Sequence, residues 1–131
     1  MNHLPINILH IFVIAPFLFY VALIRSQIAP WIYSLLIGIA VVIFVYHGYK
    51  SIIKWKAKSP SLWINLIHVL FVAPLLLFIG SKGVDTPRWA YEILAMSAFA
   101  TLGYHIYSIV LTVQEMSEVT TLKKMPEAKD N

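Results

Sequence analysis

The feature that most constrains this chain is a series of four long apolar runs separated by short polar segments. The runs cover roughly residues 5–24, 31–53, 62–80 and 89–113. Each approaches or exceeds the ~20 residues that an α-helix needs to cross the hydrocarbon core of a bilayer. Their apolar character is continuous and shows no period of two, which favours helices over the strands of a membrane barrel. We therefore predict an all-α, polytopic membrane protein with four transmembrane helices.

Composition excludes the main alternatives to a membrane protein. Of the 131 residues, 60% are hydrophobic and 12% are charged, whereas soluble domains carry about 25% charged residues. A chain this short cannot bury so much apolar surface in water, and it is too apolar to be disordered. There is no cysteine, so a disulfide framework and a thiolate metal site are excluded. The sequence also lacks phosphate-loop, hydrolase and zinc-protease motifs, which argues against an enzyme.

The chain divides into a predicted transmembrane bundle, residues 1–113, and a polar C-terminal tail, residues 114–131. Basic residues flank the apolar runs, so the net charge of +4 indicates orientation in a lipid bilayer and no nucleic-acid partner. One side would hold seven lysines: Lys50, Lys54, Lys56, Lys58, Lys123, Lys124 and Lys129. The other side would hold Arg25, Lys82 and Arg88. This distribution predicts that both termini are cytoplasmic.

The two halves of the chain align without a gap when one is shifted by 58 residues. The matched residues include Asn7, His10, Pro16, Tyr46 and His47, which fall on Asn65, His68, Pro74, Tyr104 and His105. The unit is a helical hairpin with Asn-x-x-His-x5-Pro on its first helix and Tyr-His-x-Tyr on its second. Repeat 1 covers about residues 5–54 and repeat 2 about residues 62–113. Two tandem hairpins are expected to be parallel, related by a pseudo-twofold axis along the membrane normal, in a four-helix bundle.

The repeat places one histidine on each predicted helix: His10, His47, His68 and His105. Each lies a similar distance from the cytoplasmic end of its helix, roughly 8–12 Å deep at 1.5 Å per residue. Polar residues at this depth are functional candidates, and imidazole binds Zn, Cu and haem iron. One ion could take all four rings, or the diagonal pair His10–His68 or His47–His105 could ligate haem b. Candidate supporting residues are Asn7, Asn65, Tyr46 and Tyr104.

Two further features bear on helix shape and packing. Pro16 and Pro74 each remove a backbone hydrogen bond and are expected to kink the helix that contains them. Small residues on the second and fourth runs, among them Gly38, Gly48 and Gly103, are the type that close helix packing uses.

The fourth run differs from the second by several polar residues. Glu92 lies near its non-cytoplasmic end, and Ser97 and Thr101 continue a polar stripe towards His105. This stripe could be a proton path, or Glu92 could form an ion pair with Arg88. The leading function is therefore metal or haem binding for redox or metal handling. The alternatives are proton or ion conduction by one chain or a homo-oligomer, and a structural membrane or assembly protein.

The second repeat also resembles small uncharacterised membrane proteins of large DNA viruses. The resemblance rests on Ala73-Pro74-Leu75-Leu76, Ile79-Gly80 and Gly103-Tyr104-His105-Ile106-Tyr107. It covers about one helical hairpin and implies a viral membrane protein, but the family supplies no activity or site residues that could be transferred.

Overall fold

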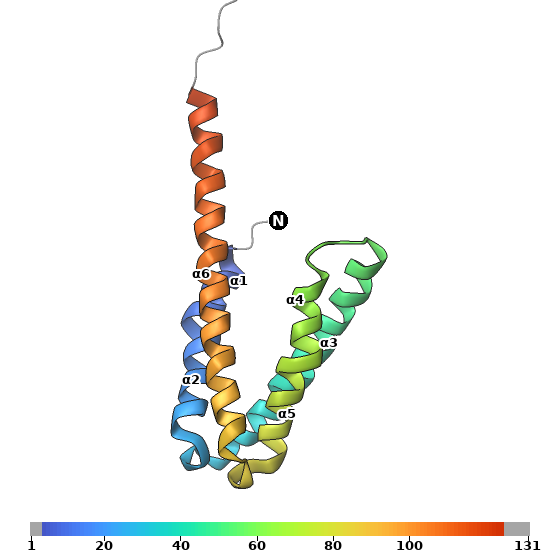
Figure 1. Ribbon diagram of the computed structural model, residues 1–131, viewed down its shortest axis with the longest axis vertical. Helices are drawn as coiled ribbons and strands as arrows, with labels where there is room; N and C mark the ends of the chain where they lie inside the picture. Colours follow the sequence, from blue (N-terminus) through green and yellow to red (C-terminus); the bar gives the residue numbers. More distant parts are fainter. Residues whose placement is uncertain (1–3, 125–131) are drawn as a thin grey trace, which may run out of the picture. The chain divides into compact units, whose positions relative to one another are not determined.

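The computed structural model describes residues 4–124, and every element in that part of the chain is helical (Figure 1). Four helical segments are long and apolar enough to cross a membrane: Leu4–Gln27, Pro30–Lys56, Leu62–Asp85 and Arg88–Thr121. The predicted all-α chain with four such segments is confirmed.

The first and third segments are each built from four consecutive helical elements. The first contains α1 (Leu4–Leu9), the π-helix η1 (His10–Ile14), α2 (Ala15–Ile24) and the 3₁₀-helix η2 (Arg25–Gln27). The third contains α4 (Leu62–Ile67), the π-helix η3 (His68–Val72), α5 (Ala73–Lys82) and the 3₁₀-helix η4 (Gly83–Asp85). Each element of the third segment begins 58 residues after its counterpart in the first, which is also the sequence offset.

The two π-helices end just before Pro16 and Pro74. A proline ring inside an α-helix clashes with the carbonyl four residues earlier, and the proline has no N–H to donate. In both segments a wider turn precedes the ring: Ala15 N–H donates to the carbonyl of His10, and Ala73 N–H donates to that of His68. The expected effect of each proline thus takes the form of a π-turn, and each π-turn begins at a histidine.

The second and fourth segments are single α-helices, α3 (Pro30–Lys56) and α6 (Arg88–Lys124). Helix α6 continues beyond residue 113, through much of the segment predicted to be a polar tail. No proline or glycine interrupts residues 114–124, and Gln, Glu, Met and Lys are good helix formers. Residues 114–121 are exposed along this extension. The remainder of the predicted tail, residues 125–131, lies outside the described residues.

Two compact units divide the chain, one made of Met1–Phe17 with Ala98–Asn131 and the other of Leu18–Ser97. In the first unit α1 lies beside α6, and in the second α3 lies along α4, η3 and α5 (Figure 1). The core of the second unit includes the fully buried side chains of Leu36, Leu76, Ile79, Tyr91 and Leu94.

Helices α3 and α5 approach each other closely at Gly80. A Cβ added there would lie 2.6 Å from Cγ1 of Ile37 and 2.8 Å from the carbonyl oxygen of Tyr33. In the same unit the hydroxyl oxygens of Tyr33 and Tyr91 are 3.3 Å apart, and both side chains are buried. The packing of this unit thus includes a close helix contact at a glycine and a pair of buried tyrosine hydroxyls.

Candidate functional site

The four predicted histidines form two stacked pairs, one in each compact unit. The ring centroids of His10 and His105 are 4.2 Å apart, with an interplanar angle of 26°. Those of His47 and His68 are 4.1 Å apart, with an angle of 8°. Each pair joins a histidine at the start of a π-turn to a histidine of a long α-helix.

An asparagine completes each group. We name the group of Asn7, His10, His105 and Ser108 cluster 1, and the group of Asn65, His47 and His68 cluster 2. In cluster 1, Nδ1 of His105 donates to Oδ1 of Asn7 at 2.8 Å, and Nδ2 of Asn7 donates to Oγ of Ser108 at 3.0 Å. Asn7 is 2% exposed and His105 8% exposed. The Asn7 amide therefore joins α1 to α6 by two hydrogen bonds in a buried position.

Cluster 2 has the same histidine–asparagine hydrogen bond as cluster 1, but the second hydrogen bond of its asparagine is longer. Nδ1 of His47 donates to Oδ1 of Asn65 at 3.1 Å. Nδ2 of Asn65 donates at 3.5 Å to the carbonyl of Ser61, on its own segment. The sequence explains this difference, because the repeat position of Ser108 is occupied by Lys50.

The histidines of the first and third segments use their own backbone. Nδ1 of His10 donates to the carbonyl of Ile6, and Nδ1 of His68 donates to that of Ile64, both at 2.7 Å. Each of these rings is thus bonded to the backbone carbonyl four residues earlier. The asparagine on the same segment bonds instead to a histidine of the neighbouring helix.

All four contacts assign the same imidazole tautomer. Carbonyl and amide oxygens can only accept a hydrogen bond, so Nδ1 carries a proton in every ring, and in a neutral ring the lone pair is then on Nε2. Neutral imidazole with its lone pair on Nε2 is a metal ligand, and an oxygen acceptor at the other nitrogen fixes the ring and raises its basicity. The arrangement is therefore chemically suited to coordination through Nε2.

The asparagines have partners different from those that the sequence suggests. The spacing of three residues predicts that Asn7 supports His10 and Asn65 supports His68, on one helical face. The structure instead pairs Asn7 with His105 and Asn65 with His47, since a backbone carbonyl already accepts from the other two rings.

The predicted tyrosines stand beside the clusters. The ring of Tyr46 lies edge-on to His47 at 5.1 Å, and the ring of Tyr104 lies edge-on to His105 at 5.2 Å. Both tyrosine side chains are partly exposed, and each is next in sequence to a histidine that bonds to asparagine.

The polar residues of the predicted proton path have local partners. Glu92 forms an exposed ion pair with Arg88, with 2.6 Å between Oε1 and Nε. Ser97 donates to the carbonyl of Ile93 at 2.8 Å, and Thr101 is half-buried further along α6. The Arg88–Glu92 alternative raised by the sequence is therefore the contact that the structure contains.

Among residues 4–124, no three His, Asp or Glu side chains are grouped so that they could hold a metal ion. The histidines come together as pairs from two helices, which the repeat alone did not reveal. No protein-family model matches the chain, and no match was found among curated proteins or solved structures.

Proposed function

We propose that this chain is an integral membrane protein that binds a transition metal through its histidine pairs, for metal handling or redox chemistry. The observation that carries the proposal is the shared tautomer: all four Nδ1 atoms donate to oxygen acceptors. Polar side chains at membrane depth are costly to bury. Metal binding would explain why four such side chains are present in apolar helices, each with its Nδ1 bonded to an oxygen.

Two tandem parallel hairpins are the proposed architecture, with the lipid bilayer as partner and both termini in the cytoplasm. The 58-residue offset in sequence supports the duplication, and so does the matching offset between π-turns at His10 and His68. The distribution of lysines supports the orientation.

The imidazole donors suit Zn or Cu, and the stacking within each cluster is unsuited to haem b. The nitrogen lone pair lies in the plane of an imidazole ring, so two stacked rings 4.1–4.2 Å apart do not aim their lone pairs at each other. Axial ligands of a haem must face each other across the iron, which excludes both rings of one cluster from that role as they stand. A Zn or Cu ion could take both rings of one cluster only if the rings opened from the stacked arrangement, because near-parallel rings do not point their lone pairs at one ion. It would also need other ligands besides the two imidazoles, because Zn is normally four-coordinate.

Metal analysis and an absorption spectrum of the purified chain test this proposal. We expect up to one Zn or Cu ion per cluster. His105→Ala should remove the ion of cluster 1 and His47→Ala that of cluster 2, and the double variant should bind none. Ser97→Ala is the matched control, because Ser97 belongs to neither cluster and its hydroxyl donates to the carbonyl of Ile93 on its own helix. A Soret band in the spectrum would show that the ligand is haem and not a Zn or Cu ion. Protein with neither bound metal nor chromophore would refute the proposal.

A structural role is the second candidate, favoured by the two hydrogen bonds of Asn7 that join α1 to α6. Hydrogen bonds between transmembrane helices contribute only about 0.6–2 kcal/mol each. On this alternative, each histidine-to-alanine change lowers the unfolding free energy by about that amount and releases no ligand. The same set of variants therefore separates the two functions.

A further inference from the structure

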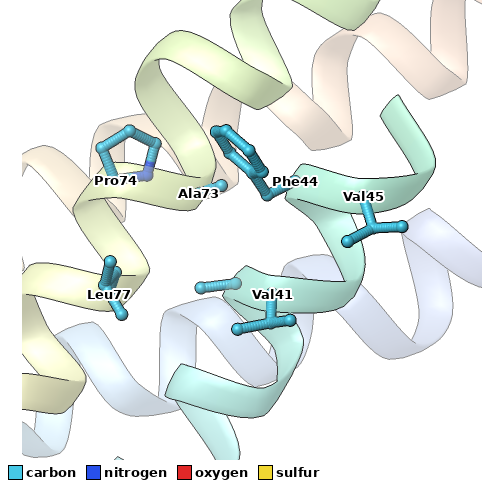
Figure 2. Close-up of a pocket in the computed structure, with 7 residues that line it drawn as sticks. Val41, Phe44, Val45, Ala73, Pro74 and Leu77 are labelled. Atoms are coloured by element: carbon cyan, nitrogen blue, oxygen red, sulfur yellow. The ribbon is translucent and has the colours of Figure 1, made fainter. Parts of the chain in front are cut away.

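Helix α3 changes from an apolar to a basic surface along its length. Midway it borders an apolar groove of about 300 Å³, which Phe44 and Val45 reach from α3 and Pro74 and Leu77 reach from α5 (Figure 2). Phe44, Val45 and Leu77 are exposed within segments that could span a membrane, so this level of α3 is suited to contact with lipid hydrocarbon. The groove ends at Val45 on α3. The basic surface begins at Lys50, about 7.5 Å further along the helix at 1.5 Å per residue.

Four lysines lie within nine residues where α3 ends and the chain turns back towards α4. No aspartate or glutamate precedes Asp85 in the sequence. In the part of the chain that the structure describes, none of the four lysines forms an ion pair with a carboxylate. The end of α3 therefore carries four positive charges without a counter-charge. The lysines are Lys50, Lys54, Lys56 and Lys58.

The second hairpin has no such charge at the same place. At the offset of 58 residues, the positions of the four lysines are occupied by Ser108, Thr112, Gln114 and Met116. Helix α6 is continuous through all four positions. A helix of this repeat can therefore form there without lysines, which points to a use of the lysines outside the fold.

Lys58 occupies a backbone position that suits glycine better. Its N–H donates to the carbonyl of Trp55 at 3.0 Å, and the N–H of Ser59 donates to the carbonyl of Lys54 at 2.9 Å. These are the two hydrogen bonds of a Schellman turn, in which the residue after the helix is left-handed and is usually glycine. Lys58 has a φ of +49° there, a conformation that is unfavourable for a residue with a Cβ. A residue kept in a strained conformation is a candidate for function.

Exposed aromatic side chains indicate that this turn lies at the membrane surface. Trp55 is 75% exposed, and Trp63, just beyond the turn, is 52% exposed. Tryptophan rings prefer the boundary between hydrocarbon and water. A lysine near a helix end extends its ammonium group from there towards the headgroups. Lipid phosphates lie at this level, and a lysine binds phosphate as a point charge.

We propose that the turn formed by residues 50–61 binds the headgroups of anionic phospholipids such as phosphatidylglycerol. Lys56 and Lys58 are exposed, and their ammonium groups contact the lipid phosphate. Lys54 donates to the carbonyl of Ser61 at 3.4 Å, and Nζ of Lys50 lies 6.0 Å from the centre of its neighbouring tyrosine ring, so these two add to the positive potential from beside the helix. Clusters of four or more basic residues next to a transmembrane helix attract anionic lipids. This site goes beyond the proposed metal binding and uses no residue of cluster 2.

Quenching of a single tryptophan by brominated lipid tests the site in the full chain. Nanodiscs contain phosphatidylcholine and phosphatidylglycerol, one of them brominated, and both leaflets have the same composition, so the orientation of the chain does not matter. With Trp55 as the sole tryptophan, we expect a preference for phosphatidylglycerol of at least about fivefold, the effect of one lysine near the headgroups. Trp31, at the opposite end of α3, is the control reporter and should show no preference.

Lys58→Gly separates the effect of charge from that of folding. Glycine relieves the positive φ, so the variant should be at least as stable as the wild type. Its preference for phosphatidylglycerol should nevertheless fall, by up to about fivefold. Lys82→Gln removes an exposed lysine at the end of α5 and is the matched control, which should keep the preference. Exchange of the four lysines for their second-hairpin counterparts (Lys50→Ser, Lys54→Thr, Lys56→Gln and Lys58→Met) should abolish it.

A Trp55 preference that persists in the four-lysine variant would overturn the proposal. So would a preference unchanged at about 1 M salt, where the Debye length is only ~3 Å. Equal displacement of the lipid by glycerol phosphate or by an RNA oligonucleotide would identify a soluble anion as the ligand and would also overturn it. Lys56→Gln and Lys58→Gly should keep the metal content of the wild type, so a failure of the metal-binding proposal leaves this test unaffected.

Discussion

Arg25 and Gly83 occupy matching positions of the repeat and share a positive φ, +58° at both. A residue with a Cβ pays roughly 1–2 kcal/mol for that conformation, whereas glycine adopts it freely. Arg25→Gly should therefore raise the unfolding free energy by about 1 kcal/mol, and Gly83→Ala should lower it by at least as much. Unfolding in mixed micelles by SDS titration measures both.

Ser26→Gly is the control for Arg25→Gly. Ser26 lies in the same exposed turn but is not among the described residues with positive φ. Glycine there should only add flexibility and lower stability slightly. A gain at Ser26 equal to that at Arg25 would contradict the backbone explanation.

The crossed pairing of asparagine and histidine makes a second prediction. Asn7→Ala leaves Nδ1 of the buried His105 without its acceptor and should cost about 1–3 kcal/mol of stability. A double-mutant cycle of Asn7 with His105 should give a coupling energy of about 0.5–3 kcal/mol. The cycle of Asn7 with His10 should give much less, since His10 bonds to the Ile6 carbonyl. The opposite ranking would restore the pairing that the sequence suggests.

The sequence identified the residues of the clusters but not their partners. Asn7, His10 and His105 stand out because polar residues are rare in apolar runs and recur at one offset. Spacing along one helix predicts which residues share a face of that helix. The residues that face them from the next helix depend on the relative rotation and shift of the two helices. Packing contacts determine these, and the periodicity of the sequence does not predict them.

At the scale of the elements, Gly80 controls the contact between α3 and α5. A methyl group at Gly80 would lie within 3 Å of Ile37 and of the backbone of Tyr33. Gly80→Ala should therefore lower the unfolding free energy by about 1–3 kcal/mol, as overpacking does. Gly38→Ala is the matched control: in the described part of the chain, nothing lies within 4 Å of a Cβ there. That variant should gain up to about 1 kcal/mol from helix propensity.

The comparison of glycines also shows what composition leaves undetermined. Gly38, Gly48 and Gly103 were candidates for close packing, yet within the described residues a Cβ at any of them would meet open space. Gly80 has the close contact and carries no distinguishing mark in the sequence. The π-turns are similar: Pro16 and Pro74 indicate a disturbed helix, but not that the wider turn would start at the histidine.

At the scale of the whole molecule, the four apolar segments were predictable because length and hydropathy are properties of each segment alone. The predicted boundaries differ from the observed ones mainly where α6 continues to Lys124. Helix association in lipid depends on a few small and polar contacts. The pairing of Tyr33 with Tyr91 and of the histidines across helices therefore required the structure.

The membrane topology of the chain can be tested by labelling single introduced cysteines, because the sequence itself contains no cysteine. Single cysteines at Ala57 and Ser117 should react with a membrane-impermeant maleimide only after the cytoplasmic side is exposed. Cysteines at Ser26 and Val84 should react from the opposite side. All four positions are exposed in the structure, so a failure to react reports the membrane and not burial within the protein. Four crossings and the excess of lysines beside Ala57 and in the C-terminal segment require this pattern. Labelling of Ala57→Cys and Ser117→Cys from opposite sides would exclude the proposed four spans, and with them the proposed parallel hairpins.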